Sequence, residues 1–322
     1  MTETTPPTNP RDALVALRAE ISKAVVGQDG AVTGLIIALV SGGHALLEGV
    51  PGVAKTLLVR TMATALDLDM ARVQFTPDLM PADITGSLVW DAGTSSFDFR
   101  AGPVFTNLLL ADEINRTPPK TQSALLEAME EHQVSVDGQT HPLADPFMVI
   151  ATQNPVEYEG TYPLPEAQLD RFLLKLELPL PDRSSEIEVV TRHAAGFDPM
   201  ALGAAGVRAV AGAADVLAAR AAAARVLVEP AVIAYVVDLV QATRSAPSLR
   251  LGVSPRGATA LLRTSRVWAW LQGRDFVTPD DVKSMAVSTL AHRVSLRAEA
   301  DLEGITARTV IEGLLASVAV PR

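Results

Sequence analysis

A phosphate-cradling loop near the N-terminus limits what this chain can fold into more than any other feature. Residues 46–56 read Leu-Leu-Glu-Gly-Val-Pro-Gly-Val-Ala-Lys-Thr. The usual loop has Gly, four residues and then Gly-Lys-Ser/Thr, between a buried strand and a helix. Gly49, Lys55 and Thr56 stand in their places, while Ala54 replaces the second glycine. Backbone N–H groups and the helix start would surround the phosphates, the lysine would add charge, and the hydroxyl would hold Mg²⁺. The loop therefore predicts a nucleoside triphosphate site.

The alanine in this loop carries its own structural expectation. A methyl group at position 54 is compatible with the loop only if the residue keeps a negative φ. We therefore expect a negative φ at Ala54, with its N–H facing the phosphates. Taken alone, the altered loop also fits a plain Gly-Pro-Gly connector between a strand and a helix, so the rest of the chain has to decide between the two.

Two kinds of pattern divide the chain. Short buried strands are predicted at 44–47, 108–111, 147–151 and 172–178, with helices at 10–26, 31–41, 56–66 and 120–131. Two β-hairpins are predicted at 87–99 and 134–140. Beyond Pro181, alanine-rich helices take over at 184–195, 208–225, 230–243, 256–271 and 279–291. We therefore expect a Thr- and Pro-rich disordered tail at 1–10, an α/β core at 11–181 and an all-helical domain at 182–322.

Composition excludes several classes of protein. No apolar run approaches the ~20 residues of a membrane span, and the start lacks the pattern of a secretory signal. The 322-residue chain has no cysteine, which excludes thiolate metal sites and fits a cytoplasmic location. A net charge of −10 argues against a surface built mainly to grip nucleic acid.

Polar residues close two later buried strands. Asp112 and Glu113 follow the apolar run at 108–111, and Asn154 follows the strand at 147–151. Sheets of α/β proteins hold ligands at the carboxyl ends of their strands. Asp112 can accept the water shell of Mg²⁺, and Glu113 can polarise a water for attack on the γ-phosphate. A solvated Asp-Glu pair is the ordinary alternative, and the preceding phosphate loop argues against it.

Two arginines complete the set of candidate residues. Arg171 lies in Leu169-Asp170-Arg171-Phe172, and Arg256 follows Ser254-Pro255 at a predicted helix start. A cation at a helix start opposes the local dipole, which suggests a use beyond helix formation. Surface ion pairs remain the alternative for each arginine.

In this order the motifs resemble those of AAA+ ATPases, and their sequences are similar to those of the MoxR family over nearly the whole chain. The similar blocks are residues 49–56, 111–116, 122–131, 151–155 and 164–172. The resemblance implies a P-loop domain whose parallel sheet is sandwiched by helices and carries two β-hairpin insertions, followed by an all-α lid. It also implies ATP and Mg²⁺ as cofactors, and Ala54 resembles a variant that this family tolerates.

The resemblance also implies roles for single residues. The phosphate-binding loop would comprise Gly49, Val50, Pro51, Gly52, Val53, Ala54, Lys55 and Thr56. The adenine would lie against Val26, Gly27 and Gln28. Thr56 and Asp112 would hold Mg²⁺, Glu113 would be the catalytic base, and Asn154 the first sensor.

The two arginines would then act between subunits or on the lid. Arg171 looks like an arginine finger for a neighbouring subunit, which implies a homo-oligomeric ring, most simply a hexamer. Arg256 looks like the second sensor, in its own subunit or across the interface.

The resemblance leaves the substrate of the motor open. It favours a chaperone-like remodeller that matures or activates protein complexes or assists metal insertion, with a partner carrying a von Willebrand A domain. The alternatives are a nucleic-acid translocase of the MCM-like branch, a chelatase motor subunit, and a nucleotide-gated scaffold with little turnover.

Charge separates the first two hypotheses. Residues 121–170 contain nine acidic residues and no Lys or Arg. Grooves that follow a nucleic-acid strand need basic charge and stacking aromatics, so a protein client is favoured. Trp90, Phe97 and Phe99 of the first hairpin are expected to pack on the core rather than to contact a peptide.

Overall fold

The chain packs as two compact units. The computed structural model describes residues 9–154 and 161–321. The first unit comprises the chain up to Leu35 together with 44–164 and 176–216, and the second comprises 36–43, 165–175 and 217 onward. The domain boundary expected at 181/182 remains a prediction; most of the predicted tail lies outside the described residues.

A five-stranded sheet forms the centre of the first unit. Its order is β2-β5-β8-β1-β9, and the β2–β5, β5–β8 and β8–β1 pairs are parallel. The strands are β1 (Ala45–Glu48), β2 (Met70–Gln74), β5 (Leu108–Asp112), β8 (Met148–Gln153) and β9 (Leu174–Glu177). β5 is buried along its whole length, as strands covered on both faces are. The predicted strands 108–111 and 147–151 are confirmed, whereas β2 was not specified from the sequence.

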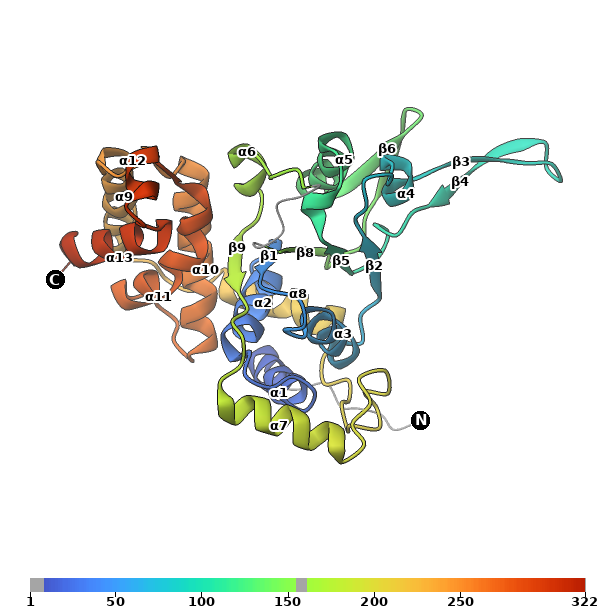
Figure 1. Ribbon diagram of the computed structural model, residues 1–322, viewed down its shortest axis with the longest axis horizontal. Coiled ribbons are helices and arrows are strands. Elements are labelled where there is room, and N and C mark those ends of the chain that lie inside the picture. Colours follow the sequence, from blue (N-terminus) through green and yellow to red (C-terminus); the bar gives the residue numbers. More distant parts are fainter. Residues whose placement is uncertain (1–8, 155–160, 322) are drawn as a thin grey trace. The chain divides into compact units, whose positions relative to one another are not determined.

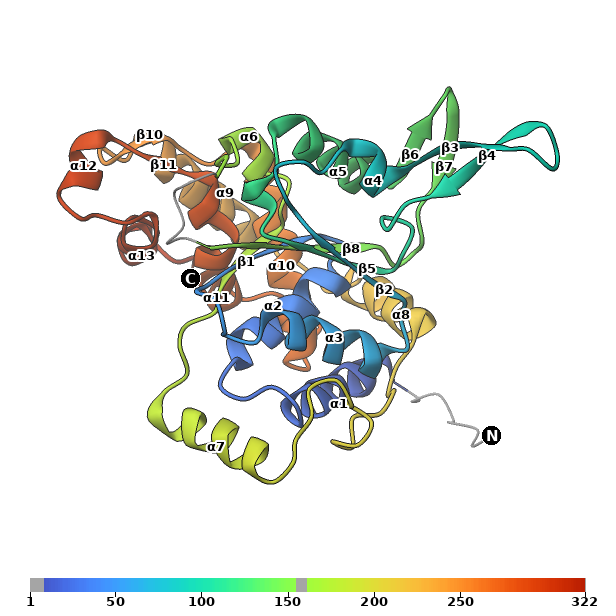
Figure 2. The ribbon, with the colours of Figure 1, turned by 45° about the vertical axis from the view of Figure 1, so that its right-hand side comes forward.

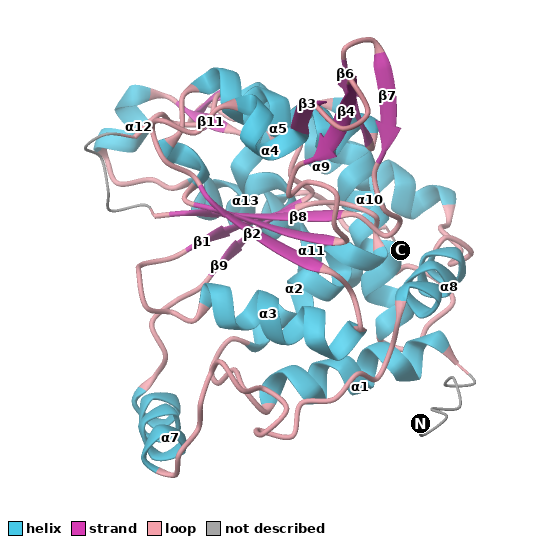
Figure 3. Cartoon of the chain, turned by 90° about the vertical axis from the view of Figure 1, so that its right-hand side faces the viewer, coloured by secondary structure: helices cyan, strands magenta, loops and turns pink. Residues whose placement is uncertain are grey.

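Helices cover both faces of this sheet. Figures 2 and 3 show α1 (Pro10–Ser22) and α3 (Lys55–Leu66) on one face, and α4 (Pro81–Thr85) and α5 (Pro119–Glu131) on the other. α1 begins as predicted, because the Asn9 side chain accepts the N–H of Arg11 and Pro10 occupies the first turn. The remaining elements of the chain up to Ala223 are α2 (Asp29–Val40), η1 (Ile114–Arg116), α6 (Glu166–Leu169), α7 (Arg183–Ala194) and α8 (Ala213–Ala223).

One predicted helix is too long. The sequence pattern predicted a helix over 208–225, but α8 begins only at Ala213. The Gly212 N–H donates to the Asp215 carboxylate (2.8 Å), so a side chain of the first turn closes the helix start. Five residues of the predicted helix therefore form a loop.

Both predicted hairpins are present. β3 (Gly86–Asp91) pairs with β4 (Ser96–Ala101), and β6 (Gln133–Val136) pairs with β7 (Gln139–Pro142). In Figure 1 the β3–β4 hairpin extends away from the sheet. The expectation that its rings pack on the core is wrong for two of them: Trp90 is 53% exposed, Phe97 is 64% exposed, and they contact each other edge to face. Phe99 instead stacks on His141 of β7 (3.9 Å between ring centroids).

The second unit is built mainly from helices. It contains α9 (Pro230–Ser245), α10 (Pro255–Leu271), α11 (Pro279–Leu290), η2 (Ala291–Arg293), α12 (Ala298–Leu302) and α13 (Ala307–Ser317). β10 (Leu249–Leu251) and β11 (Ser295–Leu296) form a small antiparallel sheet that the sequence did not reveal, as it did not reveal α12 and α13. Nowhere in the described part of the chain is a helix long and apolar enough to span a bilayer.

A buried arginine ties residues 170–173 to other parts of the second unit. The Arg293 side chain, only 2% exposed, donates from Nε to Asp170 Oδ1 (2.7 Å) and from Nη2 to the Phe172 carbonyl (2.6 Å). Its Nη1 also donates to the carbonyls of Leu173 (3.1 Å) and Thr289. Burial lowers the pKa of Arg293 to about 10, so the side chain stays charged at neutral pH.

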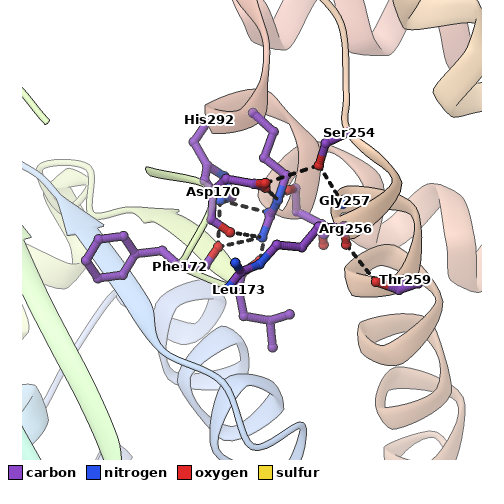
Figure 4. A network of polar contacts seen from close by, with 10 residues as sticks. Asp170, Phe172, Leu173, Ser254, Arg256, Gly257, Thr259 and His292 are labelled. Carbon is purple, nitrogen blue, oxygen red and sulfur yellow. Dashed lines mark hydrogen bonds and ion pairs between the residues drawn. The ribbon is translucent and has the colours of Figure 1, made fainter. Parts of the chain in front are cut away.

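The same network reaches the start of α10. The Ser254 hydroxyl caps that helix and donates to Asp170 Oδ2 (3.1 Å). His292 lies in η2 with its Nε2 2.9 Å from the Phe172 carbonyl. Figure 4 shows these side chains converging on Asp170 and the backbone that follows it. Asp170 therefore joins the 170–173 segment, η2 and the start of α10.

Removing Arg293 should destabilise the second unit. Arg293→Met leaves Asp170 and the carbonyls of Phe172, Leu173 and Thr289 without this donor, and we expect the free energy of unfolding to fall by about 3 kcal/mol. Arg250→Met is the matched control, because the Arg250–Glu166 pair is exposed and should contribute less than about 1 kcal/mol. Urea unfolding curves measure both values. Equal losses would contradict the claim that Arg293 contributes more to stability than an exposed ion pair does.

His292 should make stability depend on pH. Burial, aided by the charge of Arg293, lowers the pKa of His292 well below its usual range. Below about pH 6.5 the unfolded chain therefore binds a proton that the folded chain does not. As the pH falls below about 6.5, the free energy of unfolding should therefore decrease by up to about 1.4 kcal/mol for each pH unit.

The matched comparison is His292→Gln against His193→Gln, since His193 is exposed. Urea unfolding between about pH 6.5 and 5.5 should show a flatter dependence for His292→Gln only. A wild-type slope in His292→Gln would assign the effect to other groups.

Candidate nucleotide-binding site

The loop between β1 and α3 has the geometry of a phosphate site. α3 begins at Lys55, directly after the loop, so its first N–H groups face the loop side of the helix. A Cβ at Gly49 would lie 2.7 Å from the Leu178 carbonyl, which only glycine avoids. Gly52 has φ +87°, in the region that favours glycine. Both glycines are therefore required by the backbone.

Ala54 does not have the predicted backbone conformation. Its φ is +63° and its ψ is +24°, so the expectation of a negative φ is wrong. The chain enters α3 through a left-handed residue at the position where the usual loop has glycine. An L-residue with a side chain pays about 1–2 kcal/mol for this conformation. The methyl group of Ala54 is thus accommodated with strain; the orientation of its N–H remains a prediction.

The predicted phosphate and metal residues meet in one polar cavity. It has a volume of about 300 Å³ and is lined by Lys55, Thr56, Asp112, Glu113 and Asn154, together with the loop. Asp112 ends β5, Glu113 follows it and Asn154 follows β8, while the loop follows β1. Because these strands are parallel neighbours, their carboxyl ends lie at one edge of the sheet. The structure therefore brings these five predicted side chains together.

Asp112 is held by two side chains that the sequence reasoning missed or did not use. Arg72 of β2 donates to Asp112 Oδ2 from Nη2 (2.6 Å) and Nε (3.2 Å). The Thr152 hydroxyl of β8 donates to Asp112 Oδ1 (2.6 Å) and accepts the N–H of Glu113 (2.8 Å). These bonds fix the orientation of the carboxylate.

Glu113 is held in the same way. Gln74 donates from Nε2 to Glu113 Oε2 (2.7 Å), and Arg116 Nε lies 3.0 Å from the same oxygen. The backbone of Glu113 is left-handed (φ +57°), like that of Ala54. Arg72 and Gln74 lie two residues apart on β2, so they share one face of the strand, next to β5. The apolar Val73 lies between them, and this alternation was the signal available in the sequence.

The donors in this cavity suit Mg²⁺. The Thr56 hydroxyl and the Asp112 carboxylate supply hard oxygen ligands, which this ion prefers. Among the residues that the structure describes, no group of three or more His, Cys, Asp and Glu could hold a metal alone. That fits an ion that keeps several waters and binds substrate phosphates. Lys55 Nζ donates to the Gly49 carbonyl (2.7 Å), which places the charge within the loop.

An apolar cavity of about 530 Å³ adjoins the loop. Val26 and Gln28 line it, whereas Gly27 is not among its lining residues, and the expected contact of these three residues with adenine remains a prediction. Gly52, Ala54 and Leu57 line both cavities. Gln28 Nε2 donates to the Pro179 carbonyl (3.0 Å), which fixes that side chain at the wall. Gly27, with φ +73°, turns the chain between Val26 and Gln28.

Sequence reasoning missed another part of the lining of this cavity. It comes from the loop after β9, from α7 and from the residues that follow α7: Leu180, Pro181, Val189, Val190, His193 and Phe197. The His193 and Phe197 rings contact each other edge to face, 5.4 Å between centroids. The signal in the sequence was the group of apolar residues within α7. In the structure none of the α7 residues is buried. An apolar cavity beside a phosphate loop has the shape and chemistry for a purine base.

The two predicted arginines belong to the second unit. Arg171 follows Asp170, which Arg293 and Ser254 hold. Arg256 lies in the first turn of α10, two residues after Ser254. Figure 4 labels Arg256 beside this network. One carboxylate thus fixes the backbone next to Arg171 and the helix start that carries Arg256.

Replacing Ala54 by glycine should remove backbone strain. In Ala54→Gly the left-handed conformation costs little, and this gain exceeds the added flexibility of the unfolded chain by about 0.5–1 kcal/mol. Ala19→Gly, at an exposed position inside α1, is the control and should lose about 1 kcal/mol. Thermal unfolding of both variants gives the test; a loss in Ala54→Gly equal to that in Ala19→Gly would contradict the left-handed assignment.

Comparison with known proteins agrees with this geometry. Residues 44–174 match the ATPase family associated with various cellular activities (AAA), and residues 241–314 match the AAA lid domain. A solved structure of a Cytophaga hutchinsonii protein assigned as an ATPase has a TM-score of 0.89 and 43% identity, covering 97% of this chain and 96% of that one.

Three curated relatives match over most of their own length, and two of them carry the name MoxR. The uncharacterized protein YeaC of Bacillus subtilis is 47% identical, covering 94% of this chain and 92% of that protein. Chaperone MoxR1 of Mycobacterium tuberculosis is 43% identical, covering 94% and 81%. Protein MoxR of Methylorubrum extorquens is 36% identical, covering 89% and 88%. With the loop, the strand-end carboxylates and the lid in place, the chain belongs to the MoxR family of AAA+ ATPases.

Proposed function

We propose that this ATPase hydrolyses ATP with Mg²⁺ as a homo-oligomeric ring, most simply a hexamer, and remodels protein clients. The observation that carries the proposal is the polar cavity where the phosphate loop meets Asp112, Glu113 and Asn154. The adjoining apolar cavity gives the base a place next to the phosphates. A site of this kind has a place for each part of the nucleotide.

Each side chain has a distinct part in the reaction. Lys55 and the loop amides bind the phosphates and stabilise the charge that develops on them. Thr56 and Asp112 would hold Mg²⁺, which when bound neutralises phosphate charge. Glu113 accepts a proton from the attacking water, and Asn154 orients that water. Gln74 and Arg116 hold the Glu113 carboxylate, so they set the direction in which it accepts the proton.

Arginines from the second unit complete the site in a ring. Arg171 stabilises the transition-state charge on a nucleotide bound by a neighbouring subunit, and Arg256 senses the nucleotide from the lid. Support comes from the Asp170 network, which fixes the backbone beside Arg171 and the start of α10. Because the phosphate loop and the arginine finger of one site would come from different subunits, hydrolysis would depend on assembly of the ring.

The proposed client is a polypeptide. The exposed Trp90–Phe97 pair on the β3–β4 hairpin offers apolar contact area, and residues 121–170 carry nine acidic residues and no Lys or Arg. Glu127, Glu130 and Glu131 of α5 are exposed, and their charge would repel a phosphate backbone. One relative is named a chaperone, which agrees with remodelling. Stimulation of turnover by single-stranded DNA at physiological salt would instead favour a translocase.

The cellular setting follows from the same proposal. The remodelled client would be a protein complex that needs maturation or activation, including metal insertion, and a partner with a von Willebrand A domain would connect motor and client. The absence of cysteine fits work in the cytoplasm. A pull-down with a variant that binds but does not hydrolyse ATP would identify both.

Glu113→Gln should separate binding from hydrolysis. The amide cannot accept the proton of the attacking water, so turnover should fall by about 10²–10⁴-fold while ATP still binds. Glu127→Gln, an exposed change on α5, should leave turnover unaltered. Phosphate release and equilibrium nucleotide binding are the measurements. Wild-type turnover in Glu113→Gln would remove this residue from the role of base.

Arg171→Ala should lose hydrolysis without losing nucleotide. An arginine finger contributes about 10³–10⁵-fold in rate, and each subunit keeps its own phosphate loop. Mixing Arg171→Ala with Lys55→Ala subunits should restore part of the turnover, because mixed rings contain interfaces with both intact residues. Arg250→Ala, an exposed arginine of the same unit, should behave as wild type. A complete lack of rescue at every mixing ratio would argue against action between subunits.

A further inference from the structure

A further cavity, lined by arginines, lies within the second unit. Its volume is about 280 Å³, and Arg220, Arg263 and Arg266 contribute to its wall with the hydroxyl-bearing Ser41 and Thr259. None of these residues lines either part of the nucleotide site. The cavity therefore needs an explanation of its own.

Three elements position these side chains. Thr259, Arg263 and Arg266 lie at spacings of four and three residues on α10, so they share one face of that helix. Arg220 comes from α8 and donates from Nε to the Leu39 carbonyl (3.1 Å), which anchors it next to the end of α2. Ser41 directly follows α2. The cavity is thus assembled from segments far apart in the sequence.

The wall of this cavity is rich in positive charge. Among the residues that the structure describes, those lining it include three arginines and no acidic side chain. Partial burial and the like charges of Arg256 and Arg220 lower the pKa of Arg263, so its surroundings disfavour another cation. Clustered guanidinium groups repel one another unless an anion lies between them.

Two buried donors in the wall lack a partner. Ser41 is 8% exposed, and its hydroxyl makes no hydrogen bond with any described residue. Arg266 Nε is likewise buried without an acceptor. Buried polar atoms are satisfied in the great majority of cases, and an unsatisfied pair in one cavity indicates an absent acceptor. Arg266 and Ser41 therefore point to a ligand rather than to a folding defect.

We propose that this cavity binds the phosphate group of a small molecule. The guanidinium groups and the Ser41 hydroxyl present hydrogen-bond donors from several directions, which suits a tetrahedral dianion with many acceptor sites. The Thr259 hydroxyl already donates to the Arg256 carbonyl (2.8 Å), so it adds an acceptor and not a donor to the wall. A carboxylate is planar and carries one charge, so it would satisfy fewer donors and less charge. The volume leaves room for a short organic group on the phosphate, at the lower end of ordinary ligand sites.

Inorganic phosphate is the probe for this site, measured by calorimetry on the full-length chain. Lys55→Ala provides the background, because it weakens phosphate binding at the nucleotide loop. In this background we expect one phosphate per chain. Adding Arg266→Gln or Arg263→Gln should weaken it by about 10-fold or more, the effect of a charged hydrogen bond. Acetate, a planar carboxylate probe with one charge, should bind more weakly than phosphate.

Two further variants keep the test decisive. Ser41→Ala retains all arginines and a compact side chain, and should weaken phosphate binding by about 2- to 10-fold. Arg225→Gln, an arginine outside the cavity wall, should leave it unchanged. The proposal is overturned if Lys55→Ala binds no phosphate, or if the cavity variants, folded by circular dichroism, bind it as tightly as their parent.

Discussion

Parallel pairing of β1, β5 and β8 is the constraint on which the site depends. Register places Glu48 beside Gln153 and Ala111 beside Ala151, so the chain leaves all three strands at one edge. The loop, the two carboxylates and Asn154 meet there although they are far apart along the chain. Any shift of β5 relative to β8 would carry Asp112 away from Thr152, whose hydroxyl bonds both Asp112 and Glu113. Sheet register thus sets the catalytic geometry.

Strain is concentrated at this edge. Ala54 and Glu113 both adopt left-handed conformations, which residues with a side chain avoid. Both line the polar cavity. A left-handed residue turns the chain within one step, which lets the loop enter α3 and lets Glu113 diverge from Asp112. The surrounding hydrogen bonds of Gln74, Arg116 and Thr152 compensate for this cost at Glu113.

The predictability of each part follows from how local its cause is. The loop, the strand-end acids and the capped helix starts depend on neighbouring residues, so motif and periodicity predicted them. The φ of Ala54 was mispredicted because steric preference was applied to a position where loop geometry decides. Arg72 and Gln74 were missed because their roles arise from pairing of β2 with β5, and the α7 wall because apolar helix residues do not indicate which cavity they line. Long-range packing is invisible to one-dimensional patterns.

Two arginine environments in the second unit follow opposite electrostatic logic. Arg293 is buried among a carboxylate and three carbonyl groups, so each of its nitrogen atoms has an acceptor and its charge is compensated within the fold. On the α10 face with Arg263 and Arg266, the described lining of the cavity includes no acid, and Arg266 Nε has no acceptor. A buried donor without an acceptor is costly, so an anion bound in this cavity would supply for Arg266 what Asp170 and the carbonyls supply for Arg293.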